Sequence, residues 1–204
     1  MVGIPLGLAW SNAFEWFFHK YMLHERGQDK RSFWSFHWHE HHRESRKHAF
    51  EDPCYRRSVF TWSPQGKEAA ALAAGALAVA PLFPVAPFFV GTLWWSALHY
   101  YRVHKRSHLD PAWAKTNLPW HYDHHMGKDQ NANWCVTHPW FDYVMQTRKP
   151  YLDDPTLVRM RALDPEGPTI VYDWMPGGTL AERIGHLTLR EARAVALRVL
   201  QALE

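Results

Sequence analysis

Cysteine is nearly absent from the chain, and this scarcity excludes several classes of small domain. The two cysteines, Cys54 and Cys135, cannot build a disulfide framework and form no C-x-x-C pair. A disulfide-stapled secreted scaffold and a cysteine zinc finger are therefore excluded. A large excess of charge is missing too, and the net charge of +3 is too small to indicate a nucleic-acid partner. With 47% apolar residues among 204, the chain has ample material for a core and is not a disordered chain.

Charged residues are missing altogether between Ala69 and Tyr101. An uncharged run of this length is typical of a membrane segment. Pro81, Pro84 and Pro87 interrupt it, and the helical part before them would span only ~20 Å, less than a ~30 Å hydrocarbon core. We therefore predict a membrane-inserted helical hairpin that turns at the prolines and returns both ends to the same side. An alanine-rich hairpin buried in a soluble core is the alternative.

Residues 1–18 are apolar except for Glu15, but they lack the basic start and the small-residue cleavage site that are typical of a secretory signal peptide. The polar stretches 19–67 and 102–149 flank the apolar run and carry net charges of +4 and +3. The positive-inside rule then places both stretches on the cytoplasmic side. The sequence thus predicts an all-α integral membrane protein with its polar, helical part in the cytoplasm.

Histidine, in contrast, is abundant, and most of the 15 histidines fall into four short groups. Residues three or four positions apart share one face of a helix, so each of the last two groups aims several imidazoles at one point. The first pair is spaced i,i+5, about 140° apart on an α-helix, which predicts a helix end or a distorted turn there. The groups are His19 and His24; His37, His39, His41 and His42; His104 and His108; and His121, His124 and His125.

Imidazole is a ligand for iron, zinc, copper and nickel. So many imidazoles exceed the capacity of one ion, and we therefore predict two metal ions per chain. His48, His138 and His186 stand apart from the groups and are expected to be ordinary solvated or hydrogen-bonded side chains.

The order H-x-x-x-x-H, a histidine-rich HH, H-x-x-x-H and H-x-x-HH around an apolar hairpin resembles the fatty acid hydroxylase and sterol desaturase superfamily. The resemblance covers about residues 10–150 and extends into NANWCVTHPWFDYVMQTRKPY, where Asn133, Asp142 and Thr147 match the family pattern. Cys135 and Gln146 stand where glycine is usual, which puts the local backbone geometry in question.

This resemblance implies a membrane enzyme whose cytosolic, histidine-rich helical cap holds two irons, with zinc able to substitute in a purified protein. It implies O₂-dependent hydroxylation or desaturation of a membrane lipid such as a fatty acyl chain, a sterol or a carotenoid. Electrons would come from a separate ferredoxin- or cytochrome-type donor, because no such module is visible in the chain. The alternative from another class is a non-catalytic membrane metal-binding protein.

The second histidine group departs from the family pattern, because Trp38 stands where a ligand is usual. His37 or His39 must replace it, and helical angles favour His37 only slightly. Carboxylates and amides next to the ligands are candidates for fixing imidazole tautomers, namely Glu40, Asp123 and Asn133. The predicted ligands are His19, His24, His37, His39, His41, His42, His104, His108, His121, His124 and His125.

The composition changes near residue 150, after which only one histidine and one tryptophan remain. We therefore expect two segments, 1–150 and 151–204, the second a small α+β piece. In it LVRMRAL and TIVYDW flank a turn and predict a strand pair, while Thr179 and Thr188 are expected to cap two helices. This order resembles the hinge region of a protein kinase, without the glycine-rich loop or strand lysine that a kinase needs. The resemblance implies that residues 151–204 are a truncated or regulatory fusion. The alternative is that they form an amphipathic C-terminal helix that caps the first segment.

Overall fold

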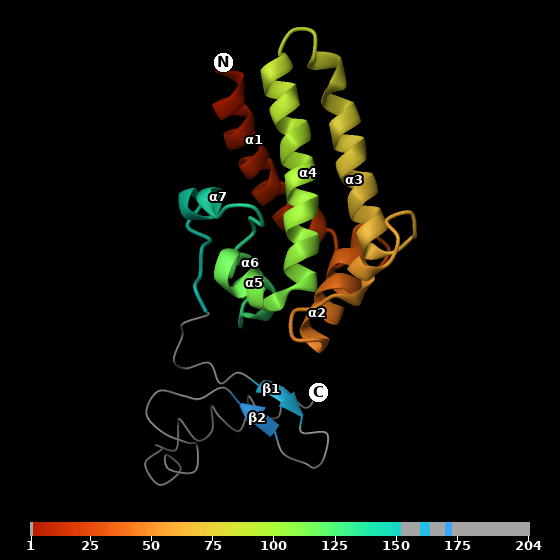
Figure 1. The fold of residues 1–204 in the computed structure, drawn as a ribbon, viewed down its shortest axis with the longest axis vertical. Coiled ribbons are helices and arrows are strands. Elements are labelled where there is room, and N and C mark those ends of the chain that lie inside the picture. The colour runs from red at the N-terminus through yellow and green to blue at the C-terminus, as the bar shows by residue number, and fades with distance from the viewer. Residues whose placement is uncertain (1, 152–159, 164–169, 173–204) are drawn as a thin grey trace. The chain divides into compact units, whose positions relative to one another are not determined.

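The computed structural model describes residues 2–151, 160–163 and 170–172, and it is mostly helical. The described chain divides into two units at residue 153, each considered by itself. In the first unit three long helices, α1, α3 and α4, run beside one another, and shorter helices gather at one end of them (Figure 1). The elements of this unit are α1 (Gly3–Phe17), η1 (Phe18–Glu25), η2 (His37–His42), α2 (Arg43–Lys47), η3 (Pro53–Arg56), α3 (Pro64–Val79), η4 (Ala80–Leu82), α4 (Pro87–Leu109), α5 (Pro111–Asn117), α6 (Pro119–Met126) and α7 (Trp140–Val144).

The helical hairpin predicted between residues 69 and 101 is present as α3 and α4. Ser63 caps the start of α3 by accepting a hydrogen bond from the Gly66 amide at 3.3 Å, and Pro64 occupies the first helical position. The chain turns through the short 3₁₀ helix η4, and α4 begins at Pro87 (Figure 1). Among the helices that the structure describes, none combines the length and the apolarity needed to cross a membrane.

Helix α1 approaches α4 closely because glycine faces it at two positions one turn apart. A Cβ atom added at Gly3 would lie 2.8 Å from the Phe89 amide nitrogen, and one at Gly7 would lie 2.7 Å from Cβ of Thr92. Only glycine allows the two backbones this contact. The packing fixes the direction in which α1 continues into η1, which carries His19 and His24.

Two segments with π-helical hydrogen bonding, η1 and η2, follow in the chain. In a π-helix, hydrogen bonds join residues five apart, so those residues lie roughly one turn apart on one face. His19 and His24 in η1, and His37 and His42 in η2, have this spacing. The distorted turn expected at His19 and His24 is thus a π-helical segment, and a second one occurs at His37–His42.

The first unit is centred on imidazole rings more than on aliphatic side chains. Its hydrophobic clusters are small, with Trp16, Trp134 and Cys135 in one and Phe50, Ala114 and Tyr122 in the other. The fully buried side chains are dominated by histidine: His19, His24, His41, His104, His108, His121, His124 and His125.

In the second unit the structure describes one antiparallel strand pair. β1 (Met160–Leu163) pairs with β2 (Ile170–Tyr172), with Met160 opposite Tyr172 and Leu163 opposite Ile170. These strands lie within the two segments for which strands were predicted. The helices expected after Thr179 and Thr188, and His186, lie outside the described residues.

Candidate metal centre

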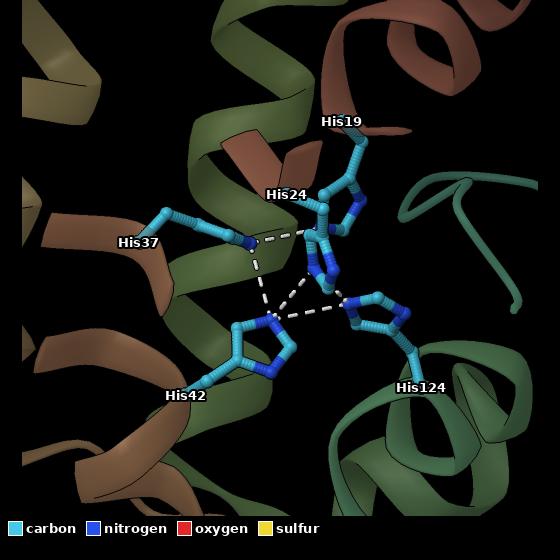
Figure 2. Close-up of side chains that lie close together, drawn as sticks. All are labelled: His19, His24, His37, His42 and His124. Atoms are coloured by element: carbon cyan, nitrogen blue, oxygen red, sulfur yellow. Dashed lines mark hydrogen bonds between the residues drawn. The ribbon is translucent and has the colours of Figure 1, made fainter. Parts of the chain in front are cut away.

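Nine buried histidines form two groups in which the ligand nitrogens of each group lie within 4.8 Å of one another. The first group comes from η1, η2 and α6, and Figure 2 shows its rings pointing toward one another. The second comes from η2, α4 and α6. Group 1 consists of His19, His24, His37, His42 and His124, and group 2 of His41, His104, His108 and His125.

The chain contains two pairs of adjacent histidines, and each pair contributes one histidine to each group. His41 belongs to group 2 and His42 to group 1, while His124 belongs to group 1 and His125 to group 2. Successive residues of a helix point about 100° apart, so adjacent histidines face neighbouring sites. The groups are in contact, since the rings of His42 and His125 stack with centroids 4.1 Å apart.

In group 1 the outer ring nitrogens donate to neutral acceptors. Nδ1 of His19 donates to the Trp134 carbonyl at 2.5 Å, and Nδ1 of His124 donates to the Ala132 carbonyl at 2.7 Å. Nδ1 of His42 donates to the side-chain oxygen of Gln130 at 2.8 Å. These bonds keep the ring proton on Nδ1 and leave the Nε2 lone pair directed into the group.

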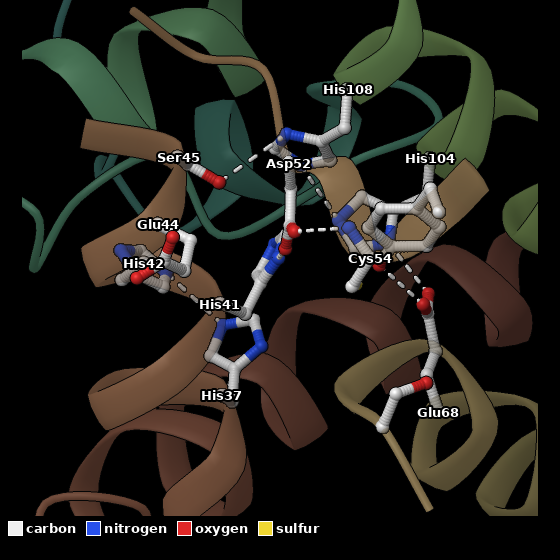
Figure 3. Close-up of polar contacts among 12 residues, drawn as sticks. His37, His41, His42, Glu44, Ser45, Asp52, Cys54, Glu68, His104 and His108 are labelled. Atoms are coloured by element: carbon white, nitrogen blue, oxygen red, sulfur yellow. Dashed lines mark hydrogen bonds and ion pairs between the residues drawn. The ribbon is translucent and has the colours of Figure 1, made fainter. Parts of the chain in front are cut away.

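In group 2 two of the outer acceptors are carboxylates. Nδ1 of His41 donates to Asp52 Oδ2 at 2.7 Å, and Nδ1 of His104 donates to Glu68 Oε1 at 2.5 Å (Figure 3). Nδ1 of His108 donates to the Phe50 carbonyl at 2.9 Å. The Nε2 lone pairs of these three rings therefore also face inward.

These inward lone pairs meet one another. Nε2 of His42 lies 3.2 Å from Nε2 of His124, and Nε2 of His108 lies 3.2 Å from Nε2 of His104. Two acceptors at this distance repel each other unless a positive charge lies between them. Nitrogens bound at about 2.1 Å to one ion, roughly at right angles, are about 3.0 Å apart. The spacing therefore fits shared metal ligands.

Both groups also contain ring nitrogens with no hydrogen-bond partner. These buried atoms, unpaired among the described residues, are Nδ1 of His24 in group 1, and Nε2 of His41 and both ring nitrogens of His125 in group 2. A buried polar atom without a partner is costly, and a bound cation would satisfy it. The donor sets of both groups thus fit metal ions.

Burial also keeps the imidazoles in the form that binds a metal. Desolvation lowers the pKa of His19 to about 3 and lowers the pKa values of seven other buried histidines well below the usual value. A metal ligand must be the neutral imidazole, so burial favours ligation. The seven are His24, His37, His42, His108, His121, His124 and His125.

Two of the predicted ligands lie outside the groups. His39 is partly exposed, and its Nε2 bonds to the Gln28 carbonyl at 2.9 Å, so His37 is the histidine of this pair in group 1. His121 is fully buried beside group 2, with Nε2 3.2 Å from Nε2 of His108. Like the unpaired atoms of group 2, its Nδ1 has no partner among the described residues.

Of the three polar residues predicted to support the ligands, Glu40 and Asp123 form ion pairs with basic side chains, and Asn133 accepts a hydrogen bond from one. Glu40 is exposed and pairs with Lys67 at 3.3 Å. Asp123 is buried and pairs with Arg148 at 3.0 Å, and Arg148 also donates to Asn133. His48 and His138 are both exposed, and both stand outside the groups, as expected.

Sequence reasoning missed the acceptors that do hold the ligands, which are Asp52, Glu68 and Gln130. Each lies more than ten positions from its histidine, and no spacing rule joins the two residues. Glu68 carried one signal, because it is the last charged residue before a long uncharged run.

The segment after the last HH supports the site through Asp142. Its carboxylate accepts from the backbone amides of Trp134 and Cys135 at 2.8 and 2.9 Å, and from the Thr147 hydroxyl at 2.7 Å. This arrangement fixes the Trp134 carbonyl that holds His19. Gln146 has a φ of 57°, a left-handed conformation that glycine adopts at least cost.

Glu15 attaches the same segment to α1. Its buried carboxylate accepts from the Val136 and Thr137 amides and from the Thr137 hydroxyl. Burial raises the pKa of Glu15 to about 7, although these hydrogen bonds lower it. Helix α1 and the segment that holds His19 are therefore joined by the carboxyl side chain of Glu15, four residues before that ligand.

Comparison with known proteins gives no match to a protein-family model, to a curated protein or to a solved structure.

Proposed function

We propose that the chain is an O₂-dependent di-iron enzyme that hydroxylates or desaturates a membrane lipid. The observation that carries the proposal is the pair of adjoining buried histidine groups, whose inward-facing Nε2 atoms lie close together. Two iron ions there would supply the redox chemistry needed to activate O₂ against an unactivated C–H bond.

The chain's own residues would bind the ions, fix their ligands and keep water out. Group 1 and group 2 supply the ligand nitrogens, and the acceptors behind them hold each ring in one tautomer. All nine of these histidines are at most 3% exposed, so bulk water is kept out of the site. A dry site protects reactive intermediates from side reactions with water.

An apolar groove between α1 and α4 supports a lipid substrate. It has a volume of about 440 Å³ and is lined by Ile4, Leu8, Pro87, Phe88, Gly91, Thr92 and Trp95. Helix α4 also carries His104 and His108, and Trp95 lies about 14 Å from His104 along the helix at 1.5 Å per residue. An extended hydrocarbon chain covers such a distance.

The surroundings of the groove support a membrane location, with the histidine groups on the cytoplasmic side. Large apolar side chains are exposed along α1 and around the hairpin turn, which is typical of surfaces that contact lipid or protein. These exposed apolar side chains include Trp10, Phe14, Phe17, Leu77, Phe83, Val85, Phe88 and Trp95.

Electrons would arrive from a separate ferredoxin- or cytochrome-type protein.

Lipid mass spectrometry of cells with and without the expressed chain tests the proposal. A product heavier by one oxygen atom indicates hydroxylation, and one lighter by two hydrogens indicates desaturation. His125→Ala should abolish the product, whereas His48→Ala, on the surface, should not. Two bound metal ions with no lipid product in the presence of O₂ and a reductant system would instead favour a non-catalytic metal-binding protein.

A further inference from the structure

The two histidine groups differ in the charge of the residues behind them. Group 1 rings donate to carbonyl oxygens of Trp134 and Ala132 and to the amide of Gln130, all neutral. Group 2 rings donate to Asp52 and Glu68. Among the described residues, no carboxylate bonds to a group 1 ring.

Asp52 is buried and Glu68 is largely so, and water therefore screens their charges little. The side chain of Asp52 is 2% exposed and that of Glu68 is 11% exposed. Neither has a lysine or arginine partner among the described residues; their ion-pair partners there are His41 and His104. Their charge is therefore felt mainly by the imidazoles and by whatever those imidazoles bind.

Each carboxylate is also held in place by a second hydrogen bond. The Cys54 amide donates to Asp52 Oδ1 at 2.9 Å, and the Tyr55 hydroxyl donates to Glu68 Oε2 at 2.5 Å. Asp52 is thus held in one position by His41 and the Cys54 amide, and Figure 3 shows its carboxylate beside His41.

The geometry points to two inequivalent metal positions, with group 2 holding its ion more tightly than group 1. A carboxylate behind an imidazole raises the basicity of the ligand, and removing such a partner typically lowers metal affinity 10–100-fold. With a divalent ion and neutral rings, the two carboxylates neutralise group 2, whereas group 1 keeps the charge of its ion. The same difference stabilises the higher oxidation state of a redox metal at group 2. This inference rests on the metal-binding part of the proposed function.

Equilibrium competition between the purified full chain and a chelator tests the inference without any enzymatic assay. The zinc-loaded protein is equilibrated with graded EDTA, and its remaining zinc is measured by elemental analysis. We expect two separate steps of one ion each. His124→Ala should remove the step at low EDTA, and His125→Ala, its neighbour on α6, should remove the step at high EDTA.

The carboxylates are tested by variants that keep their shape. Glu68→Gln and Asp52→Asn should each shift the high-EDTA step 10–100-fold toward lower EDTA and leave the other step in place. Glu68→Asp should keep more of the affinity than Glu68→Gln. Glu40→Gln is the matched control, because Glu40 is an exposed carboxylate next to His41, and it should shift neither step. Circular dichroism verifies that each variant is folded.

Three outcomes would overturn the inference without contradicting metal binding. Both ions could be lost in one step, or the high-EDTA step could disappear in His124→Ala. Alternatively, the high-EDTA step could stay in place in both carboxylate variants. A folded protein that binds no zinc at all would instead contradict the proposed function.

Discussion

Mild acid should unfold the metal-free protein, because burial opposes the protonation of the imidazoles in its interior. Burial lowers the pKa of eight histidines in the folded state, whereas the unfolded chain accepts protons at a pKa of about 6.5. Below that pH the unfolded state binds more protons than the folded state. Stability is therefore fully present above about pH 7 and falls as the pH drops.

The magnitude follows from the number of rings. At pH 5.5, one unit below the unfolded pKa, each histidine favours unfolding by about 1.4 kcal/mol. Eight of them together amount to about 11 kcal/mol, comparable with the whole stability of a typical domain. The metal-free protein should therefore lose most of its stability between pH 7 and pH 5.5.

Urea unfolding followed by circular dichroism at fixed ionic strength, in steps from pH 7.5 to 5.5, measures this dependence. His125→Gln should reduce the number of protons taken up on unfolding by about one, and the exposed His48→Gln should leave it unchanged. Zinc should move the whole acid transition to lower pH, because the ion competes with protons for the same nitrogens. A stability that stays constant from pH 7.5 to 5.5 would refute the reasoning.

Four further substitutions test the packing of the helices and the backbone around the site by urea unfolding. Gly7→Ala should cost about 1–3 kcal/mol, because its methyl group meets Thr92 on α4; Gly75→Ala, with open space around it, should instead stabilise by about 0.5–1 kcal/mol. Gln146→Gly should stabilise the protein by about 1 kcal/mol by removing left-handed strain, and no gain would mean that the turn is not strained. Asp142→Asn should cost about 1–3 kcal/mol, because its amide group would face backbone donors; an unchanged midpoint would contradict the assigned hydrogen bonds.

The sequence predicted the helical hairpin and the convergence of the histidines because both depend on local rules. Proline is disfavoured inside a helix and favoured at its first position, and residues three and four apart share a helix face. Thus Pro87 begins α4, and His104 and His108 meet. The expectation of a membrane segment rests on composition alone and stays a prediction.

Other parts of the site depend on long-range contacts, which no spacing reveals. Asp52 lies 11 residues from His41, and Glu68 lies 36 residues from His104. The π-helical turn at His37–His42 was not predicted either. On an α-helix, residues five apart such as His37 and His42 point about 140° apart, whereas in a π-helix they share a face. Angles calculated for an α-helix therefore barely distinguished His37 from His39 as the ligand.

The division of each HH pair between the two groups has a consequence for the integrity of the centre as a whole. His41 and His42 are joined by one peptide bond, as are His124 and His125, so the separation of the two sites is set by backbone geometry on two independent helices. The sites cannot slide apart or be lost one at a time through a change of loop length. An insertion of one residue within either pair would rotate a ligand away from its ion, and unfolding of α6 would remove a ligand from both ions at once.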